Sequence, residues 1–260
     1  MASLKIVSRD EFAGLRWRPV TNYQFTVKDS FCQLVLQELA TACLHTPLAL
    51  FKRDDHFVPV SIQALLPMSN LLVGANGAWN SAYIPSPYRA YPFLLMKGAD
   101  NANLLAVDMD SGLVDAQPGG LPFFDEGGEP AERVREVMNF LSHVQANRER
   151  TQKACELLAE YALIEPWPIL LPGNNEERRI EGYYRIEEGR FNALPADRLA
   201  ALRDAGALPL IFAQLISMQH LPLFIKLTLA REARAQTQAP PPSFGTPMAS
   251  SASKASDEAG

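Results

Sequence analysis

Residues 207–230 read ALPLIFAQLISMQHLPLFIKLTLA, an apolar stretch long enough to cross a membrane as one helix. A chain with such a stretch has to place it in lipid or cover it with other parts of the protein. A spanning helix would bury Gln219 and His220 near its middle, which costs several kcal/mol. Pro222 is tolerated in the first turn of a helix but not in its interior. We therefore expect two core helices that meet near Pro222, and no transmembrane segment.

The composition fits a chain that covers those helices with its own core. Of the 260 residues, 47% are hydrophobic and 20% are charged, which is ordinary for a globular protein. The formal net charge is −5, and no Lys/Arg cluster marks a phosphate-binding face, so nucleic acid is not expected as a partner. The start MASLKIVSRDEFAGL lacks the apolar core of a secretory signal. We expect a cytoplasmic protein, with association with the cell surface as an alternative.

Short apolar runs in the first half of the chain predict strands. Residues 1–25 are expected to be extended, with LKIV and NYQFTV as short strands. Turn residues separate LALF, FVPVSI, NLLV, AWNSAY, FLLMK and NLLAVD within residues 48–108. Asn76-Gly77 indicates a type I′ hairpin, since both residues tolerate a positive φ. These runs predict one strongly curved, mostly antiparallel sheet.

Helical periodicity marks several other segments. Residues 31–44 have a mostly apolar stripe that also contains Glu38, and Asp29 or Ser30 can cap this helix. A long, charged pattern begins at Pro130, as one helix or as two joined near Asn147. Residues 194–206 predict a short helix that ends at Gly206. WPILL and RRIEGYYRI predict a hairpin across PGNNEE.

The fold class expected from this order is α+β, with the sheet packed against the helices. We expect a single domain over residues 1–235, with a sheet-rich part at about 1–125 and a helical part at about 129–235. Residues 236–260 are rich in Pro, Ser and Ala and nearly lack large apolar residues. Such a segment cannot bury enough surface to offset the entropy of ordering, so we expect a disordered tail.

The chain carries no catalytic or metal-binding fingerprint. Its histidines lack HxxxH or HExxH spacing, its widely spaced cysteines Cys32, Cys43 and Cys155 form no CxxC pair, and no GxSxG elbow or phosphate loop is present. Buried free thiols fit a reducing compartment. Carboxylates at Asp108, Asp110 and Asp115 lack the calcium-loop pattern. We expect no metal and no cofactor.

The most distinctive segment is YIPSPYRAYPF, residues 83–93, where prolines stiffen a chain that presents tyrosines and an arginine. Such side chains are enriched at binding hot spots. The segment LRWRPVTNYQF, residues 15–25, is also rich in aromatic and arginine residues. It takes part in recognition only if it meets residues 83–93 in space; otherwise both segments simply close the core. The candidate ligand-binding residues of the two segments are Arg16, Trp17, Tyr23, Tyr83, Tyr88, Arg89 and Tyr91.

Arg148 and Asp108 complete the set of candidate ligand-binding residues. Arg148 lies in register with the apolar stripe of the long helix. A charged group there must reach solvent, for example at a helix break, form an ion pair with Asp108 or Asp125, or meet a ligand.

The succession of segments resembles the bacterial SapC family over about residues 4–230. The resemblance is carried by LRWRPVTNYQF, FVPVSI, YIPSPYRAYPFLL, PFFDEGGEP, NRERT and IEGYYRIEEGRFNALP. It implies a link with a bacterial surface layer, or an accessory role near halogenase-like proteins, oxygenases and receptors for nutrient uptake. The chain does not resemble the peptide-uptake permease of the same name, which has multiple spanning helices. The resemblance supplies no active-site residues.

Three hypotheses for the function follow. The first is a binding or accessory protein that recognises a peptide, a small molecule or a partner enzyme through the aromatic and arginine surface. The second is an enzyme of unknown class that uses Asp108, Asp125, His56 or Arg148 in a cleft between the sheet and the long helix. The third is a structural protein of the cell envelope, which predicts a large exposed apolar patch and self-association.

Overall fold

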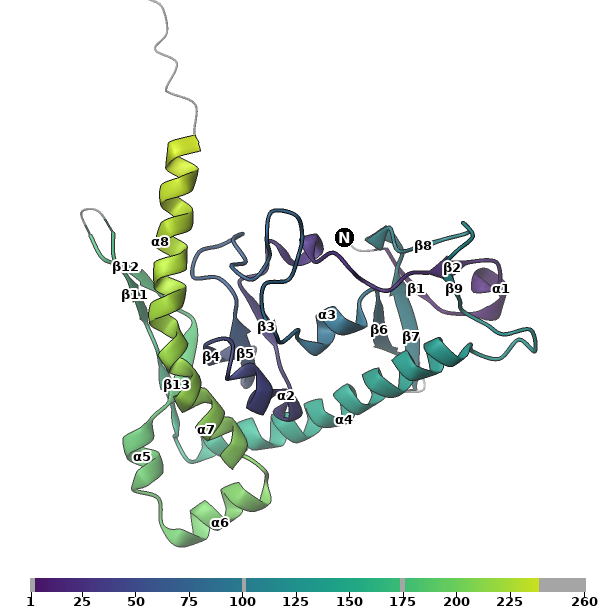
Figure 1. Ribbon diagram of the computed structural model, residues 1–260. Helices are drawn as coiled ribbons and strands as arrows, with labels where there is room; N and C mark the ends of the chain where they lie inside the picture. The colour runs from purple at the N-terminus through teal and green to yellow at the C-terminus, as the bar shows by residue number, and fades with distance from the viewer. Residues whose placement is uncertain (1–2, 100–101, 174–175, 239–260) are drawn as a thin grey trace, which may run out of the picture.

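The computed structural model describes residues 3–99, 102–173 and 176–238 (Figure 1). It confirms the α+β class, since helices pack against antiparallel strands. Within the described residues the strands are divided among four sheets, so the expectation of one curved sheet is wrong. The reason is that residues 63–92 form no ladder of paired strands. They instead place α3 (Ser86–Ala90) between the five-stranded sheet and a three-stranded sheet.

The five-stranded sheet has the order β10-β13-β4-β5-β3. Its strands are β3 (Phe31–Gln33), β4 (Leu48–Arg53), β5 (His56–Ile62), β10 (Ile164–Pro166) and β13 (Tyr183–Ile186). Side chains alternate between its two faces, as a strand requires. Leu48 and Leu50 join a core cluster with Cys155 and Leu210, whereas Ala49 joins a second cluster with Phe224. Helices therefore cover both faces of this sheet.

Two small sheets stand beside it and form a third core cluster. β1 (Leu4–Ile6) pairs with β7 (Asn103–Asp108), which pairs with β6 (Phe93–Lys97). The hairpin of β6 and β7 was expected from FLLMK and NLLAVD. β2 (Arg16–Trp17) lies between β8 (Val114–Asp115) and β9 (Leu121–Pro122). Phe12 from α1 (Arg9–Phe12) packs edge-to-face on Phe123, with ring centroids 4.9 Å apart.

The helix predicted for residues 31–44 begins later than expected. Residues 31–33 form β3 because they pair with β5, Phe31 opposite Ile62. The helix α2 spans Leu36–Ala42 and follows Val35, whose N–H donates to the Glu38 carboxylate at 3.0 Å. Asp29 and Ser30 therefore do not cap it. Cys32 lies on a strand, and all three cysteines are buried and free.

Three of the predicted strands do not form. The NYQFTV segment contains the 3₁₀ turn η1 (Gln24–Thr26). NLLV and AWNSAY are joined only by a bridge between Val73 and Trp79. Gly77 has a φ of 78°, but Asn76 does not have a positive φ, so the turn is not type I′.

The long helix α4 spans Glu132–Glu160 without a break, so the alternative of two helices joined near Asn147 is wrong. After it, β11 (Ile169–Leu171) and β12 (Arg178–Ile180) form the expected hairpin. The part expected to be helical also contributes β10 and β13 to the five-stranded sheet. Two short helices follow, α5 (Glu188–Asn192) and α6 (Ala196–Asp204), and Gly206 has the left-handed φ of 70° expected after α6.

The apolar stretch forms α7 (Leu208–Ser217), the 3₁₀ turn η3 (Met218–His220) and α8 (Leu221–Gln238), which meet near Pro222 as expected. Leu208–Ala235 is the one helix within the described residues that is long and apolar enough to cross a membrane, and 33% of its apolar window is buried. α8 includes residues 236–238, which were expected to belong to the tail. The rest of the expected tail, residues 239–260, lies outside the described residues.

Candidate functional site

The candidate site surrounds α3, which lies between α2, β6 and α4 (Figure 1). Proline shapes this segment. Pro85 precedes the helix with an extended φ and ψ, and Pro87 takes an early helical position whose N–H has no intrahelical partner. The segment therefore presents its side chains from a backbone with little freedom to lose.

A buried glutamate fastens α3 to α2. Glu38 is only 6% exposed, and its carboxylate accepts hydrogen bonds from the Ser86 N–H at 2.7 Å and the Ser86 hydroxyl at 2.9 Å. The Tyr83 hydroxyl also donates to it, and Arg89 Nη2 lies 3.6 Å away. Burial, together with the Glu38 charge, raises the pKa of Tyr83, so its hydroxyl stays a donor. A buried charge is tolerated here because its oxygens are occupied by donors.

Arg89 is the exposed cation of the site. Its guanidinium carbon lies 4.9 Å from the ring centroid of Phe140 and 5.9 Å from that of Tyr83. The side chain is 44% exposed, so the guanidinium faces solvent while the rings fix its position. It can therefore donate hydrogen bonds to a ligand.

Tyr88, by contrast, points into the interior and is 6% exposed. Its hydroxyl donates to Asp29 Oδ2 at 2.7 Å and lies 3.0 Å from Gln63 Oε1. Burial raises the pKa of Tyr88 and, despite that hydrogen bond, the pKa of Asp29. Tyr88 was expected to line a recognition surface, whereas the structure makes it an anchor of α3.

The segments 15–25 and 83–93 do meet in space. The rings of Phe25 and Tyr91 stack with centroids 3.9 Å apart, and Phe25 also meets the edge of Tyr88 at 5.9 Å. Tyr23 packs against Trp79 at 5.5 Å. The condition set for recognition by Trp17 and Tyr23 is therefore met geometrically.

Between the two segments lies a cavity of about 230 Å³, here called the Trp17 hollow. Trp17, Val20, Tyr23, Arg89, Tyr91 and Val137 are among the residues that line it. Trp17 is 6% exposed and packs edge-to-face on Phe93 at 4.8 Å. Its Nε1 finds no acceptor among the described residues. The nitrogen itself is buried, so the structure does not offer it to a ligand in the hollow.

Two more cavities adjoin α3 and share residues with the Trp17 hollow. One, of about 290 Å³, is lined by Glu38, Tyr83, Arg89, Phe140 and His143 among others. The other, of about 320 Å³, is lined by Tyr91, Leu95, Leu141, Val144 and Arg148 among others. Because Arg89 borders two of the three cavities and Tyr91 borders two, the cavities form a cluster along one side of α4.

Three predicted residues lie at or beyond the margin of this cluster. Arg16 is exposed, and its Nη1 donates to the Gly120 carbonyl at 3.3 Å, outside the three cavities. Asp108 accepts a hydrogen bond from the Tyr91 hydroxyl at 3.3 Å, and burial together with this charge raises the pKa of Tyr91 to about 12. Arg148 reaches solvent from an unbroken helix, so no break is needed to expose it.

The structure does have a groove between the sheet and the long helix. It measures about 670 Å³ and is lined by Arg53, His56, Arg148, Lys153 and Glu156 among others. Asp108 and Asp125 do not line it, and Asp125 instead lies 4.0 Å from Arg135. Of the residues expected in an enzyme cleft, the groove therefore brings together only His56 and Arg148. Arg148 forms no ion pair with Asp108 or Asp125.

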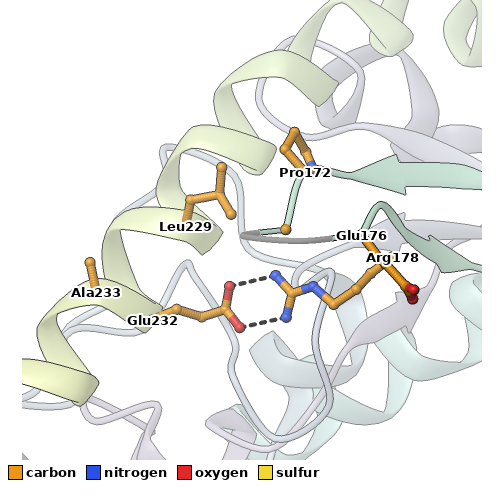
Figure 2. Close-up of a pocket in the computed structure, with 7 residues that line it drawn as sticks. Pro172, Glu176, Arg178, Leu229, Glu232 and Ala233 are labelled. Atoms are coloured by element: carbon orange, nitrogen blue, oxygen red, sulfur yellow. Dashed lines mark hydrogen bonds and ion pairs between the residues drawn. The ribbon is translucent and has the colours of Figure 1, made fainter.

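A separate cavity of about 500 Å³ lies between α8 and the β11–β12 hairpin (Figure 2). Arg178 and Glu232 face each other across it through two hydrogen bonds of 2.6 Å each. This pairing lowers the pKa of Glu232, while Arg178 Nε finds no acceptor among the described residues. The two central charges of this cavity are therefore paired with each other, whereas the Arg89 guanidinium at the Trp17 hollow faces solvent.

Sequence reasoning missed Glu38 and Ser86 as determinants of the site. One signal was available, because Glu38 stands in an otherwise mostly apolar helical stripe. A carboxylate in such a place must find donors. Phe25 and Phe140 gave no local signal, since their partners are distant in the sequence.

Comparison with known proteins agrees with the resemblance noted above. The family model described as SapC matches residues 7–223. No curated protein and no solved structure matches the chain. The match includes every residue named here for the Trp17 hollow and covers most of the chain. The chain therefore belongs to the SapC family.

Proposed function

We propose that this chain is a binding protein whose Trp17 hollow receives an apolar group attached to a hydrogen-bond acceptor, such as a carboxylate. The observation that carries the proposal is the convergence of two distant aromatic segments around one exposed guanidinium, that of Arg89. The rings supply apolar contact. Arg89 supplies charged donors.

The fixed position of α3 supports this function. Glu38 holds the helix through Ser86 and Tyr83, and Tyr88 holds it from the other side through Asp29. Binding groups on such a segment lose little freedom when a ligand arrives. The site is therefore preorganised, with its binding groups held in place before a ligand binds.

The size of the hollow suits part of a ligand. A cavity of about 230 Å³ is smaller than the 300 to 1,000 Å³, roughly, that encloses a drug-sized molecule. It fits one side chain or one ring. The adjoining cavities can receive neighbouring groups, which makes an extended peptide the preferred ligand class. Such a protein would present peptides to a partner enzyme, which is one form of the accessory role that the family resemblance implies.

The proposal can be tested with 3-phenylpropionate, which joins a ring to a carboxylate, and with 3-phenylpropanol, which lacks the charge. Calorimetry or NMR titration should show that the acid binds more tightly than the alcohol. Arg89→Gln should weaken binding of the acid about tenfold or more, since charged hydrogen bonds are worth about 1.5–3 kcal/mol. The control is Arg16→Gln, which removes an exposed arginine outside the hollow.

The proposal fails if the two variants bind the acid equally well, or if the acid produces no shift at residues lining the hollow. The melting temperature of each variant shows whether the fold is intact. Glu38 keeps its donors from Ser86 and Val35 when Arg89 is replaced, so a folded variant is expected.

A further inference from the structure

The helices α7 and α8 expose a row of large apolar side chains. Phe212, Ile216, Leu223 and Leu227 are 49%, 52%, 52% and 41% exposed. Their spacing of four, seven and four residues places them on one side of a continuous helical rod. α7 and α8 run on from one another along one edge of the molecule (Figure 1). These four side chains are here called the apolar stripe.

The charges beside the stripe are basic. Lys226 and Arg234 are exposed and follow the same helical spacing as Leu223, Leu227 and the exposed Ala230. The only acidic side chain within 208–238 is Glu232, which is bound by Arg178. Neither Lys226 nor Arg234 forms an ion pair within the described part of the chain. The exposed face is thus apolar and positively charged, although the whole chain carries −5.

The opposite side of the rod belongs to the protein core. Ile211 and Leu210 pack in the cluster of Leu50, and Phe224 packs in the cluster of Ala49. Gln214 accepts a hydrogen bond from the Ile186 N–H of the central sheet at 3.0 Å. Removing the rod to cross a bilayer would break these contacts. Contact with lipid through the exposed side alone keeps them.

We propose that the apolar stripe, with Lys226 and Arg234, binds the surface of a membrane that contains anionic lipid. An amphipathic helix with an apolar face and basic residues lies in the plane of such a surface, where apolar burial and charge attraction add. A second copy of the chain fits less well, because its stripe offers no carboxylate to Lys226 or Arg234. Charge complementarity therefore favours lipid.

The inference is independent of the Trp17 hollow. The family match ends at Leu223, so Lys226, Leu227 and Arg234 lie beyond it. The argument rests on the exposure and charge of this chain's own residues. It requires no ligand at α3.

The experiment is sedimentation of the full-length protein with two kinds of vesicle, pure phosphatidylcholine and a mixture of phosphatidylcholine with phosphatidylglycerol. The wild type should bind the anionic vesicles and bind the neutral ones much less. The double variant Leu223→Gln/Leu227→Gln should lose about tenfold or more in partitioning, because two apolar side chains no longer enter the interface. Lys226→Gln should lose about fivefold, the effect of one basic residue near such a surface.

Leu170→Gln is the matched control, since Leu170 is 45% exposed on β11 and does not belong to the stripe. It should bind like the wild type, and so should Arg89→Gln, which separates this inference from the proposed function. Absence of binding to anionic vesicles, or an equal loss in the Leu170 variant, contradicts the proposal. Light scattering that shows a dimer converted to a monomer by the double variant, without vesicle binding, would assign the stripe to a second copy.

Discussion

The ring of Phe25 stacks on the ring of Tyr91, with centroids 3.9 Å apart and planes 12° from parallel. This contact joins two residues that lie 66 positions apart in the sequence. It brings Tyr23 close to α3, and Tyr91 and Tyr23 then border the same hollow. Whether the aromatic residues of the two segments could act together was therefore decided by a long-range contact.

Replacing Glu38 by glutamine should destabilise the fold markedly. The amide nitrogen that replaces one carboxylate oxygen cannot accept from Ser86, Tyr83 or Val35, which leaves buried donors unpaired. We expect a loss of about 2–4 kcal/mol in the free energy of unfolding, measured by urea denaturation. Glu156→Gln, at an exposed position on α4, should change it by less than about 0.5 kcal/mol.

Removing only the hydroxyl of Tyr88 should also lower stability. Tyr88→Phe leaves the half-buried carboxylate of Asp29 without this donor, at a cost of about 1–3 kcal/mol. Tyr161→Phe serves as the control, because Tyr161 is half-buried and its hydroxyl makes no hydrogen bond within the described residues. If both changes have the same small effect in urea denaturation, Tyr88 does not anchor α3.

Asp29 should make the stability depend on pH. Burial raises the pKa of Asp29 above its ordinary value of 3.8, so the folded state binds its proton more tightly than the unfolded state. The contribution of Asp29 is therefore most favourable below pH 3.8 and is lost as the pH rises through the raised folded value. Asp29→Asn keeps an acceptor for Tyr88 and removes the titration. The stability of the wild type relative to this variant should fall as the pH rises across that window. If the relative stability instead rises with pH across that window, folding lowers the pKa of Asp29 and the prediction is wrong.

Filling the Trp17 hollow should block binding without harming the fold. Val20 is half-buried and borders the cavity, so Val20→Phe places a ring into about 230 Å³ of free space. We expect an unchanged melting temperature and loss of measurable 3-phenylpropionate binding by NMR titration. Val20→Thr, which is similar in size to valine, should still bind the acid. Retained binding in the phenylalanine variant would place the ligand elsewhere.

Several elements could be predicted because their signals are local. The hairpin of β6 and β7 has short apolar runs on either side of a turn, and Gly206 supplies the left-handed residue that ends the helix before it. The start of α8 just before Pro222 follows from the chemistry of proline, which is tolerated in the first turn of a helix. The start of α2 could not be predicted in this way, because residues 31–33 satisfy a helical pattern equally well. Pairing with β5 decided that they form a strand.

The amino-acid sequence alone determined the α+β class, the long helix and the two apolar helices, because backbone propensity and side-chain periodicity act over a few residues. The tertiary structure decided which side chains share a cavity. It turned Tyr88 inward, buried Glu38 beneath Ser86 and left Arg89 exposed over Phe140. Such contacts join residues far apart in the chain, and their energies depend on packing and burial that no local pattern specifies.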